Sequence, residues 1–244
     1  LIPCLISLQY KGIEWLENSY PDFLPRSFFN PFPGGIFIRP YRAGEEVLKS
    51  ENHKADFISL KDNYENCWQG ITITTTIEKF EPLKGYIYKQ YYLLRPGVPV
   101  LAIFAEVVNA QGIACFHTFN CSFHRKHRQG EKDGLFYIQQ EDNTWQMITQ
   151  TKEQDDISLD YKTLAMQISD SDNYLQLVKL RRFSTGCLYM DPSVAVLDTN
   201  IYTEMVTQTP ARTEPIFILI ADVLYQSEWL NQLRDLQFPV IFGS

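Results

Sequence analysis

The feature that most constrains the fold is a two-residue alternation of apolar and polar side chains that recurs along the chain. In residues 71–77, Ile71, Ile73 and Ile77 share one parity while threonines fill the other. Successive side chains of a strand point to opposite faces, so this spacing predicts a β-strand with one face in a core. The 244 residues are 45% apolar and 21% charged, a balance that excludes disordered, collagen-like and coiled-coil chains.

The same alternation, bounded by turn-forming residues, predicts many further strands and one helix. Trp229, Leu230, Leu233 and Leu236 recur at helical spacing, which predicts a helix over residues 227–237. Closely spaced strands with few helices are typical of sandwiches and barrels, so we expect an all-β fold, a large antiparallel β-sandwich (supersandwich) with one short C-terminal helix. The strands are expected at 35–39, 56–60, 71–77, 86–94, 100–108, 113–124, 135–139, 145–149, 164–168, 174–182, 187–190, 194–197, 201–207 and 215–223.

Residues 100–108 and their two flanking turns indicate the centre of the sheet. The segment is apolar on both faces except for Glu106, as expected of a strand covered on both sides. Pro96 and Gly97 enforce a turn before it. Residues 109–112 form a hairpin-like turn after it, so 113–124 is expected to be the returning strand. Glu106 must then face a groove, take up a proton, or pair with a base such as Arg39 or Arg181.

The organisation of the chain is predicted to be simple. We expect one β-sandwich domain over residues 31–244, with residues 1–30 an extension or the end of a preceding domain. Because the sequence starts at Leu1, it is interpreted as a processed product or as part of a longer protein. A neighbouring domain or a second copy of the chain is therefore an open candidate partner.

Charge, hydropathy and cysteine content narrow the class of partner and the location. The net charge is −7 and the pI is about 5.2, which argues against nucleic acid and anionic membrane surfaces as partners. No apolar run is long enough to span a bilayer, and no signal peptide is recognisable. The five cysteines are odd in number and widely spaced, so we expect reduced core thiols, no metal site, no cofactor and a cytoplasmic location.

One block of sequence goes beyond a generic β pattern. It runs from Trp68-Gln69-Gly70 through Lys84-Gly85 and the Tyr91–Leu101 segment, with its Arg-Pro-Gly-Val-Pro turn, to Glu106-Val107-Val108-Asn109. This block resembles the galactose mutarotase-like supersandwich domains, which occur as aldose 1-epimerases and as modules of carbohydrate-active enzymes. The resemblance covers residues 30–225 loosely and residues 68–109 best.

The resemblance implies a sugar-sized groove on a concave sheet face and acid/base chemistry there. His117 would be the acid, and a late carboxylate, Glu204 or Asp222, would be the base; we take Glu204. By their own chemistry, Arg39, Trp68, Tyr88 and Glu106 are the candidate contacts to the substrate. The two proposed catalytic residues, His117 and Glu204, can also be interpreted as purely structural. His117 shares its parity with Cys115, Phe119 and Cys121 and could be a hydrogen-bonded core histidine. Glu204 could be a surface position on a polar strand.

Three functions remain open at this point. The first is a carbohydrate-active enzyme that binds or converts a sugar, such as an aldose 1-epimerase-like isomerase. The second is a non-catalytic module that binds glycans or packs on a neighbouring domain, and the third is a structural sandwich that contacts other proteins. A histidine and a carboxylate in an aromatic groove would favour the first. Aromatic residues in a groove without that pair would favour the second, and a flat apolar patch the third.

Overall fold

The computed structural model describes residues 3–17, 34–40, 50–108, 116–124, 134–148, 155–159, 163–167, 172–179, 186–191, 194–202, 211–225 and 227–239. At residues 116–120, 122–124, 155–159, 186, 200, 202 and 227 it describes the backbone alone.

The described chain is dominated by a ten-stranded antiparallel sheet. Its centre is β7 (Val100–Val108), which pairs with β6 (Ile87–Leu94) on one side and with β17 (Ile216–Ala221) and the short β16 (Ala211–Arg212) on the other. One half continues from β6 to β5 (Cys67–Thr76) and ends at β4 (Asn52–Lys61). The other half continues from β17 through β13 (Tyr174–Lys179), β12 (Thr163–Gln167), β9 (Leu135–Gln139) and β10 (Trp145–Met147).

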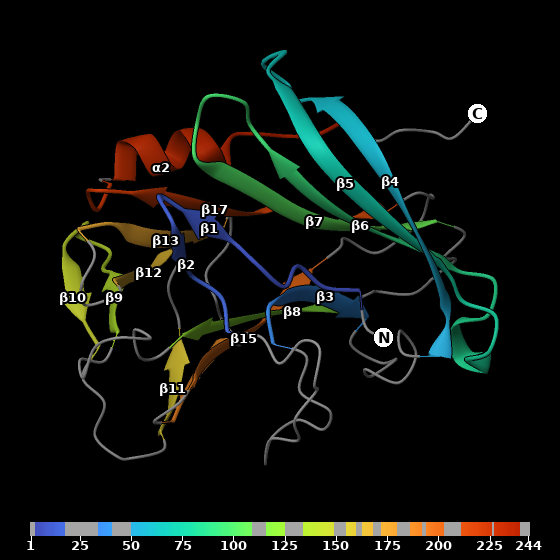
Figure 1. Ribbon diagram of the computed structural model, residues 1–244, viewed down its shortest axis with the longest axis horizontal. Helices are drawn as coiled ribbons and strands as arrows, with labels where there is room; N and C mark the ends of the chain where they lie inside the picture. The colour runs from blue at the N-terminus through green and yellow to red at the C-terminus, as the bar shows by residue number, and fades with distance from the viewer. Residues whose placement is uncertain are drawn as a thin grey trace.

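A second, five-stranded sheet packs on one face of the large sheet. Its order is β11 (Asp155–Leu159), β14 (Gly186–Met190), β15 (Val194–Tyr202), β8 (Phe116–His124) and β3 (Ile36–Pro40). On the opposite face of the large sheet lies α2 (Ser227–Arg234), as Figure 1 shows. The remaining described elements are the hairpin of β1 (Gln9–Tyr10) and β2 (Ile13–Glu14) and the 3-10 turn η2 (Glu81–Leu83).

The strand alternation divides the apolar side chains of the large sheet between two cores. One parity, which includes Ile103 of β7 and Ile218 of β17, is buried against residues of the smaller sheet such as Leu197. The other parity, which includes Phe104 and Phe217, is buried beneath α2 and the segment that follows it. A strand buried on both faces must be apolar at nearly every position, which explains the composition of β7 and β17.

The predicted fold class is confirmed by these sheets and by the helix that begins at Ser227. The prediction that residues 113–124 return beside 100–108 is wrong. β8 lies in the smaller sheet, between β15 and β3, so the connection after β7 crosses from one sheet to the other. Alternation gives the parity of a strand but not its neighbour. Residues 194–202 form one strand rather than two, and β11, which begins with two aspartates, was not predicted.

The N-terminal residues contribute to the main core. Leu5 pairs with Ile36 of β3 through two backbone hydrogen bonds, and Trp15 and Leu16 are fully buried between the sheets. The division between residues 1–30 and 31–244 stays a prediction.

Four of the five cysteines lie within the described ranges, and Cys115 lies outside them. Cys4, Cys67, Cys121 and Cys187 form no disulfide, and Cys67 is exposed rather than in a core. Within those same ranges, no helix has the length and the apolar character needed to cross a bilayer.

Gly70 provides a test of the sheet. A Cβ added to Gly70 of β5 would overlap the carbonyl oxygen of Tyr92 on β6, so the two backbones approach too closely for a side chain. We expect Gly70→Ala to lower the free energy of unfolding by about 1–3 kcal/mol, the usual cost of overpacking. Urea denaturation followed by tryptophan fluorescence measures it. Gln69→Ala, at the exposed neighbouring position, should stay within about 0.5 kcal/mol of the wild type, and an equal effect of both would contradict the close approach.

Candidate functional site

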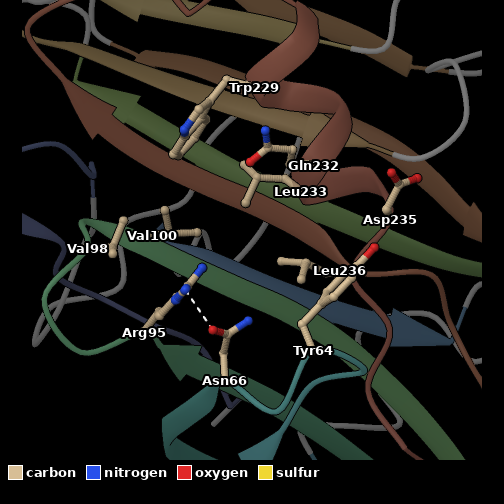
Figure 2. Close-up of a pocket in the computed structure, with 10 residues that line it drawn as sticks. All are labelled: Tyr64, Asn66, Arg95, Val98, Val100, Trp229, Gln232, Leu233, Asp235 and Leu236. Atoms are coloured by element: carbon tan, nitrogen blue, oxygen red, sulfur yellow. Dashed lines mark hydrogen bonds between the residues drawn. The ribbon is translucent and has the colours of Figure 1, made fainter.

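The candidate site is a pocket of about 350 Å³ between α2 and two turns of the large sheet. One turn joins β4 to β5 and the other joins β6 to β7, so segments far apart in sequence form its walls (Figure 2). We call it the α2 pocket. It is lined by Tyr64, Asn66, Arg95, Val98, Val100, Trp229, Gln232, Leu233, Asp235 and Leu236.

The helix reaches the sheet because its apolar residues recur on one side. Leu230, Leu233 and Leu236 are buried in the core beneath α2, whereas Gln232 is exposed. Arg234 fixes the helix laterally, because its guanidinium donates to the Lys179 carbonyl at 3.1 Å and to the Thr163 hydroxyl at 2.8 Å. These contacts place one wall of the α2 pocket.

Asn63 ties the end of the helix to the β4–β5 turn. Its side-chain amide donates to the Asp235 carbonyl at 3.1 Å and accepts from the Gln237 backbone at 2.8 Å. Its own backbone N–H donates to the Gln237 carbonyl at 2.9 Å. The two walls of the pocket are therefore held at a fixed separation by one asparagine.

The β4–β5 turn is shaped by a buried carboxylate. Asp62 Oδ1 accepts the backbone N–H groups of Tyr64 at 2.8 Å and Asn66 at 3.0 Å, and Oδ2 accepts the indole N–H of Trp68 at 2.9 Å. The Asn66 side-chain amide donates to the same carboxylate. Burial opposes ionisation, but the hydrogen bonds from Trp68, Asn66 and Tyr64 prevail and lower the pKa of Asp62. Asp62 thus orients Tyr64 and Asn66 at the pocket.

The β6–β7 turn supplies the cation. Pro96 and Gly97 occupy its central positions, Gly97 has φ of +78°, and the Val98 N–H donates to the Arg95 carbonyl at 3.2 Å. This is the geometry of a type II turn, which requires a residue that tolerates positive φ at its third position. The Arg95 guanidinium donates to Asn66 Oδ1 at 2.8 Å and points into the α2 pocket (Figure 2).

Aromatic surface borders the polar groups. Trp229 is half-buried and stacks on Tyr225 with ring centroids 4.4 Å apart, which fixes its plane. Tyr64 is 60% exposed on the opposite wall, and Asp235 lies beside it (Figure 2). The lining contains no histidine, and its ionisable side chains are Tyr64, Arg95 and Asp235. Such a lining can hold a polar ligand with an apolar face.

Two predicted contact residues lie on the face of the large sheet beneath α2. Trp68 is fully buried and packs on Phe217 and Phe238, so its ring has no surface available to a ligand. Glu106 is fully buried and pairs with Arg212 at 2.6 Å and with Lys89 at 3.7 Å. The expected pairing of Glu106 with a base is therefore found, but with Arg212: Arg39 lies on β3 in the smaller sheet, and Arg181 lies outside the described residues. Arg212 was not predicted, because the two-residue strand β16 that carries it gives no alternation signal in sequence.

Arg212 makes this second, buried cluster rigid. It donates to the carbonyls of Phe238 at 2.7 Å and Pro239 at 2.6 Å, and its guanidinium lies over the rings of Phe104 and Tyr91. Burial, together with the Glu106 carboxylate, raises the pKa of Tyr91 to about 12. We call this group the Glu106–Arg212 cluster; its opposite charges are paired within the protein and covered by the chain after α2.

The remaining predicted residues lie elsewhere. Tyr88 is buried in the core between the sheets, and Arg39 is half-buried on β3 opposite Thr118. The backbone of His117 lies opposite Ile201 and Pro40 in the smaller sheet, and its side chain is not described. Glu204 lies outside the described residues. The structure thus does not bring Arg39, Trp68, Tyr88 and Glu106 to one surface, and the roles of His117 and Glu204 stay predictions.

Sequence reasoning missed Tyr64, Asn66, Arg95 and Asp235. The turn at Pro96-Gly97 and the helix were both predicted, so two walls of the α2 pocket were predicted one by one. The sequence does not predict that residues 64, 95 and 235 lie close together, because their proximity depends on where α2 packs on the sheet. A Pro-Gly turn next to an arginine and an exposed tyrosine beside an Asx-type turn were the available signals.

Comparison with known proteins yields a fold and no family. No family model matches the chain, and no curated protein matches it. Among solved structures, the Slr1438 protein from Synechocystis sp. PCC 6803 superimposes on 87% of this chain and 86% of its own, with a TM-score of 0.51 and 13% identity. At that identity the likeness shows a shared fold alone.

Two α-galactosidases are also similar in structure. The GH36 enzyme AgaA from Geobacillus stearothermophilus, solved in complex with stachyose, covers 91% of this chain with a TM-score of 0.44 and 8% identity. The α-galactosidase from Lactobacillus brevis covers 84%, with a TM-score of 0.41 and 8% identity. The chain spans 35% and 30% of these two proteins, respectively.

The Glu106–Arg212 cluster predicts a non-additive effect of substitutions. Arg212→Met should lower the free energy of unfolding by about 3–5 kcal/mol, because it leaves the buried Glu106 carboxylate with Lys89, 3.7 Å away, as its remaining cationic partner among the described residues. Adding Glu106→Leu should recover part of that loss, since the stranded charge is removed. Urea denaturation of both variants measures this. Lys84→Met, which breaks an exposed pair with Glu81 of similar length, should change stability by at most about 1 kcal/mol. Additive losses in the double variant would contradict the pairing.

We expect the Asp62 carboxylate to make a pH-dependent contribution to the free energy of unfolding. Its folded-state pKa is lowered, so its stabilisation is present above the unfolded-state pKa of about 4 and is lost as pH falls through the folded-state value. Asp62→Asn should therefore be clearly less stable than the wild type at pH 7, and the difference should narrow below pH of about 4. Denaturation midpoints at pH 7 and pH 3 measure it, and a constant difference would contradict the assignment.

Proposed function

We propose that the chain is a carbohydrate-binding β-sandwich domain whose ligand, a neutral sugar, lies in the α2 pocket. The observation that carries the proposal is the combination of two aromatic side chains, Tyr64 and Trp229, with converging polar groups on a pocket of sugar size. The resemblance of residues 68–109 to mutarotase-like domains supports the choice of sugar as the ligand class.

The aromatic and apolar lining suits the faces of a sugar ring. A pyranose presents a patch of C–H groups on one face, and an amphipathic aromatic side chain buries such a patch while its polar atom stays hydrated. Trp229 is held by Tyr225 and the helix, so little side-chain entropy is lost when a ligand packs against it. Leu233, Leu236 and Val100 extend the apolar surface.

The polar lining suits hydroxyl groups rather than a charged ligand. Arg95 supplies donors in a fixed fork, Asp235 supplies acceptors, and Gln232 supplies both. Adjacent sugar hydroxyls each donate and accept, so they can bridge a cation and an anion that lie on opposite walls. The formal charges of Arg95 and Asp235 cancel, and hence the pocket gives no net attraction to an ionic ligand.

The lining supports binding better than catalysis. An epimerase requires an acid and a base on opposite sides of the sugar ring, and Asp235 is the single carboxylate among the lining residues. This favours the non-catalytic module over the enzyme. Conversion of a sugar by His117 and Glu204 in a concave sheet groove remains a separate prediction, which the same experiments can address.

The proposal is tested by sugar binding to matched variants. A glycan array followed by isothermal titration identifies a ligand of the wild type. Arg95→Ala should weaken its binding about tenfold or more, because a hydrogen bond to a charged group contributes about 1.5–3 kcal/mol. Trp229→Ala should weaken it by a similar factor, because it removes the aromatic surface on which the sugar ring packs. Trp229→Phe, which keeps a ring, should weaken it less. Lys84→Ala removes an exposed cation away from the pocket and should leave it unchanged.

Two outcomes would contradict the proposal. One is that no sugar binds; the other is that Trp229→Ala and Arg95→Ala bind it as tightly as the wild type. Polarimetry on freshly dissolved aldoses separates binding from conversion. An acceleration that is lost in His117→Ala and retained in Trp229→Ala would favour the epimerase prediction instead.

A further inference from the structure

The end strand of the large sheet has an available edge. β4 pairs with β5 over ten register positions, from Asn52 opposite Thr76 to Lys61 opposite Cys67. No other described strand pairs with β4, and Figure 1 shows it at the margin of the fold. The strand contains no proline, so its outward backbone donors are intact. An edge of this length is a template for pairing with another strand.

An apolar row runs out of the core onto this edge. Ile103, Tyr92, Ile71 and Phe57 lie opposite one another on β7, β6, β5 and β4. Their exposed fractions rise along the row, from 0% and 7% to 39% and 92%. Tyr92 is the last of them beneath the smaller sheet, where its hydroxyl donates to the Ile36 carbonyl of β3 at 3.4 Å. Phe57 and Ile71 therefore extend the core surface beyond its cover.

We propose that β4 pairs antiparallel with β4 of a second copy of this chain, on a two-fold axis at Ala55. Directly opposed residues of an antiparallel pair share a face, so a symmetric pair that keeps the sheet continuous places one residue opposite itself. The choice of that residue sets every other contact, and the charges on β4 decide it.

The charges on β4 exclude some positions of the two-fold axis. Lys54 and Asp56 lie two apart on one face and already contact each other at 3.0 Å. A pair centred on either would oppose like charges. A pair centred on Phe57 would oppose Lys54 with Leu60, which is buried within its own protomer. Centred on Ala55, Lys54 of each copy opposes Asp56 of the other, which gives two cross-strand ion pairs.

The other face of the same register covers the apolar row. Ala55 lies opposite Ala55 of the second copy, and its small side chain leaves room on both sides. Phe57 of each copy then lies diagonal to that alanine and opposite His53 of the other copy, next to its own Ile71. Seven residues of each strand, 52–58, take part. So short a contact buries less surface than a standard interface of about 1,600 Å². We therefore expect a weak dimer with micromolar affinity.

Complementary charge reversals test the register directly. Sedimentation velocity from about 1 to 200 μM should show a concentration-dependent dimer for the wild type. Lys54→Asp and Asp56→Lys should each be monomeric at 200 μM, because each opposes like charges twice. Mixed in equal amounts, the two variants should form a heterodimer, since every opposed pair is then of opposite sign. Phe57→Ser should weaken the wild-type dimer at least tenfold.

Two control variants separate this pairing from general surface effects. Met147→Ser removes an exposed apolar side chain from β10, the opposite edge of the same sheet, and Lys61→Asp reverses a charge on β4 outside the paired segment. Both should dimerise like the wild type. A wild type that stays monomeric at 200 μM, or a dimer that Met147→Ser disrupts and Phe57→Ser does not, would overturn the proposal. Absence of a heterodimer in the mixture would overturn the register.

Discussion

Burial of the large sheet on both faces is the constraint on which the rest of the structure depends. A sheet with one wet face could be completed by the smaller sheet alone. Here β7 and β17 are apolar on both parities, and the second parity carries Phe104 and Phe217, so a further layer has to cover it. That layer is α2 and the chain that follows it. The α2 pocket exists where this cover meets the turns at the end of the sheet.

The two buried carboxylates on this face, Asp62 and Glu106, have different structural roles. Asp62 organises a turn through hydrogen bonds to backbone and side-chain donors, and so sets the position of one pocket wall. Glu106 instead connects β7 to the segment after α2, because its partner Arg212 also donates to the carbonyls of Phe238 and Pro239. A buried pair of this kind adds little net stability over an apolar replacement, yet it fixes which segment lies where.

The sequence predicted what local rules control and missed what long-range packing controls. The bounds of β7 and β9 coincide with the prediction, because alternation and flanking turns are local signals. The predicted pairing of 113–124 with 100–108 failed because a strand pattern does not name its neighbour. The predicted aromatic contacts Trp68 and Tyr88 are core residues, since a period-two pattern marks a face as apolar without saying what covers it. Tyr64, Arg95 and Trp229 come together only through the packing of α2.

The bond between Asn63 and the Gln237 backbone joins residues 174 apart in the chain. Contacts of such separation carry a large loop-closure entropy, so the cover over the outer face is expected to form late in folding. Until it does, Trp68, Phe104 and Phe217 face water, and Trp68 does so on the strand next to the edge strand β4. We therefore expect conditions that slow the docking of α2 to favour self-association of the incomplete sheet and to lower the yield of folded protein.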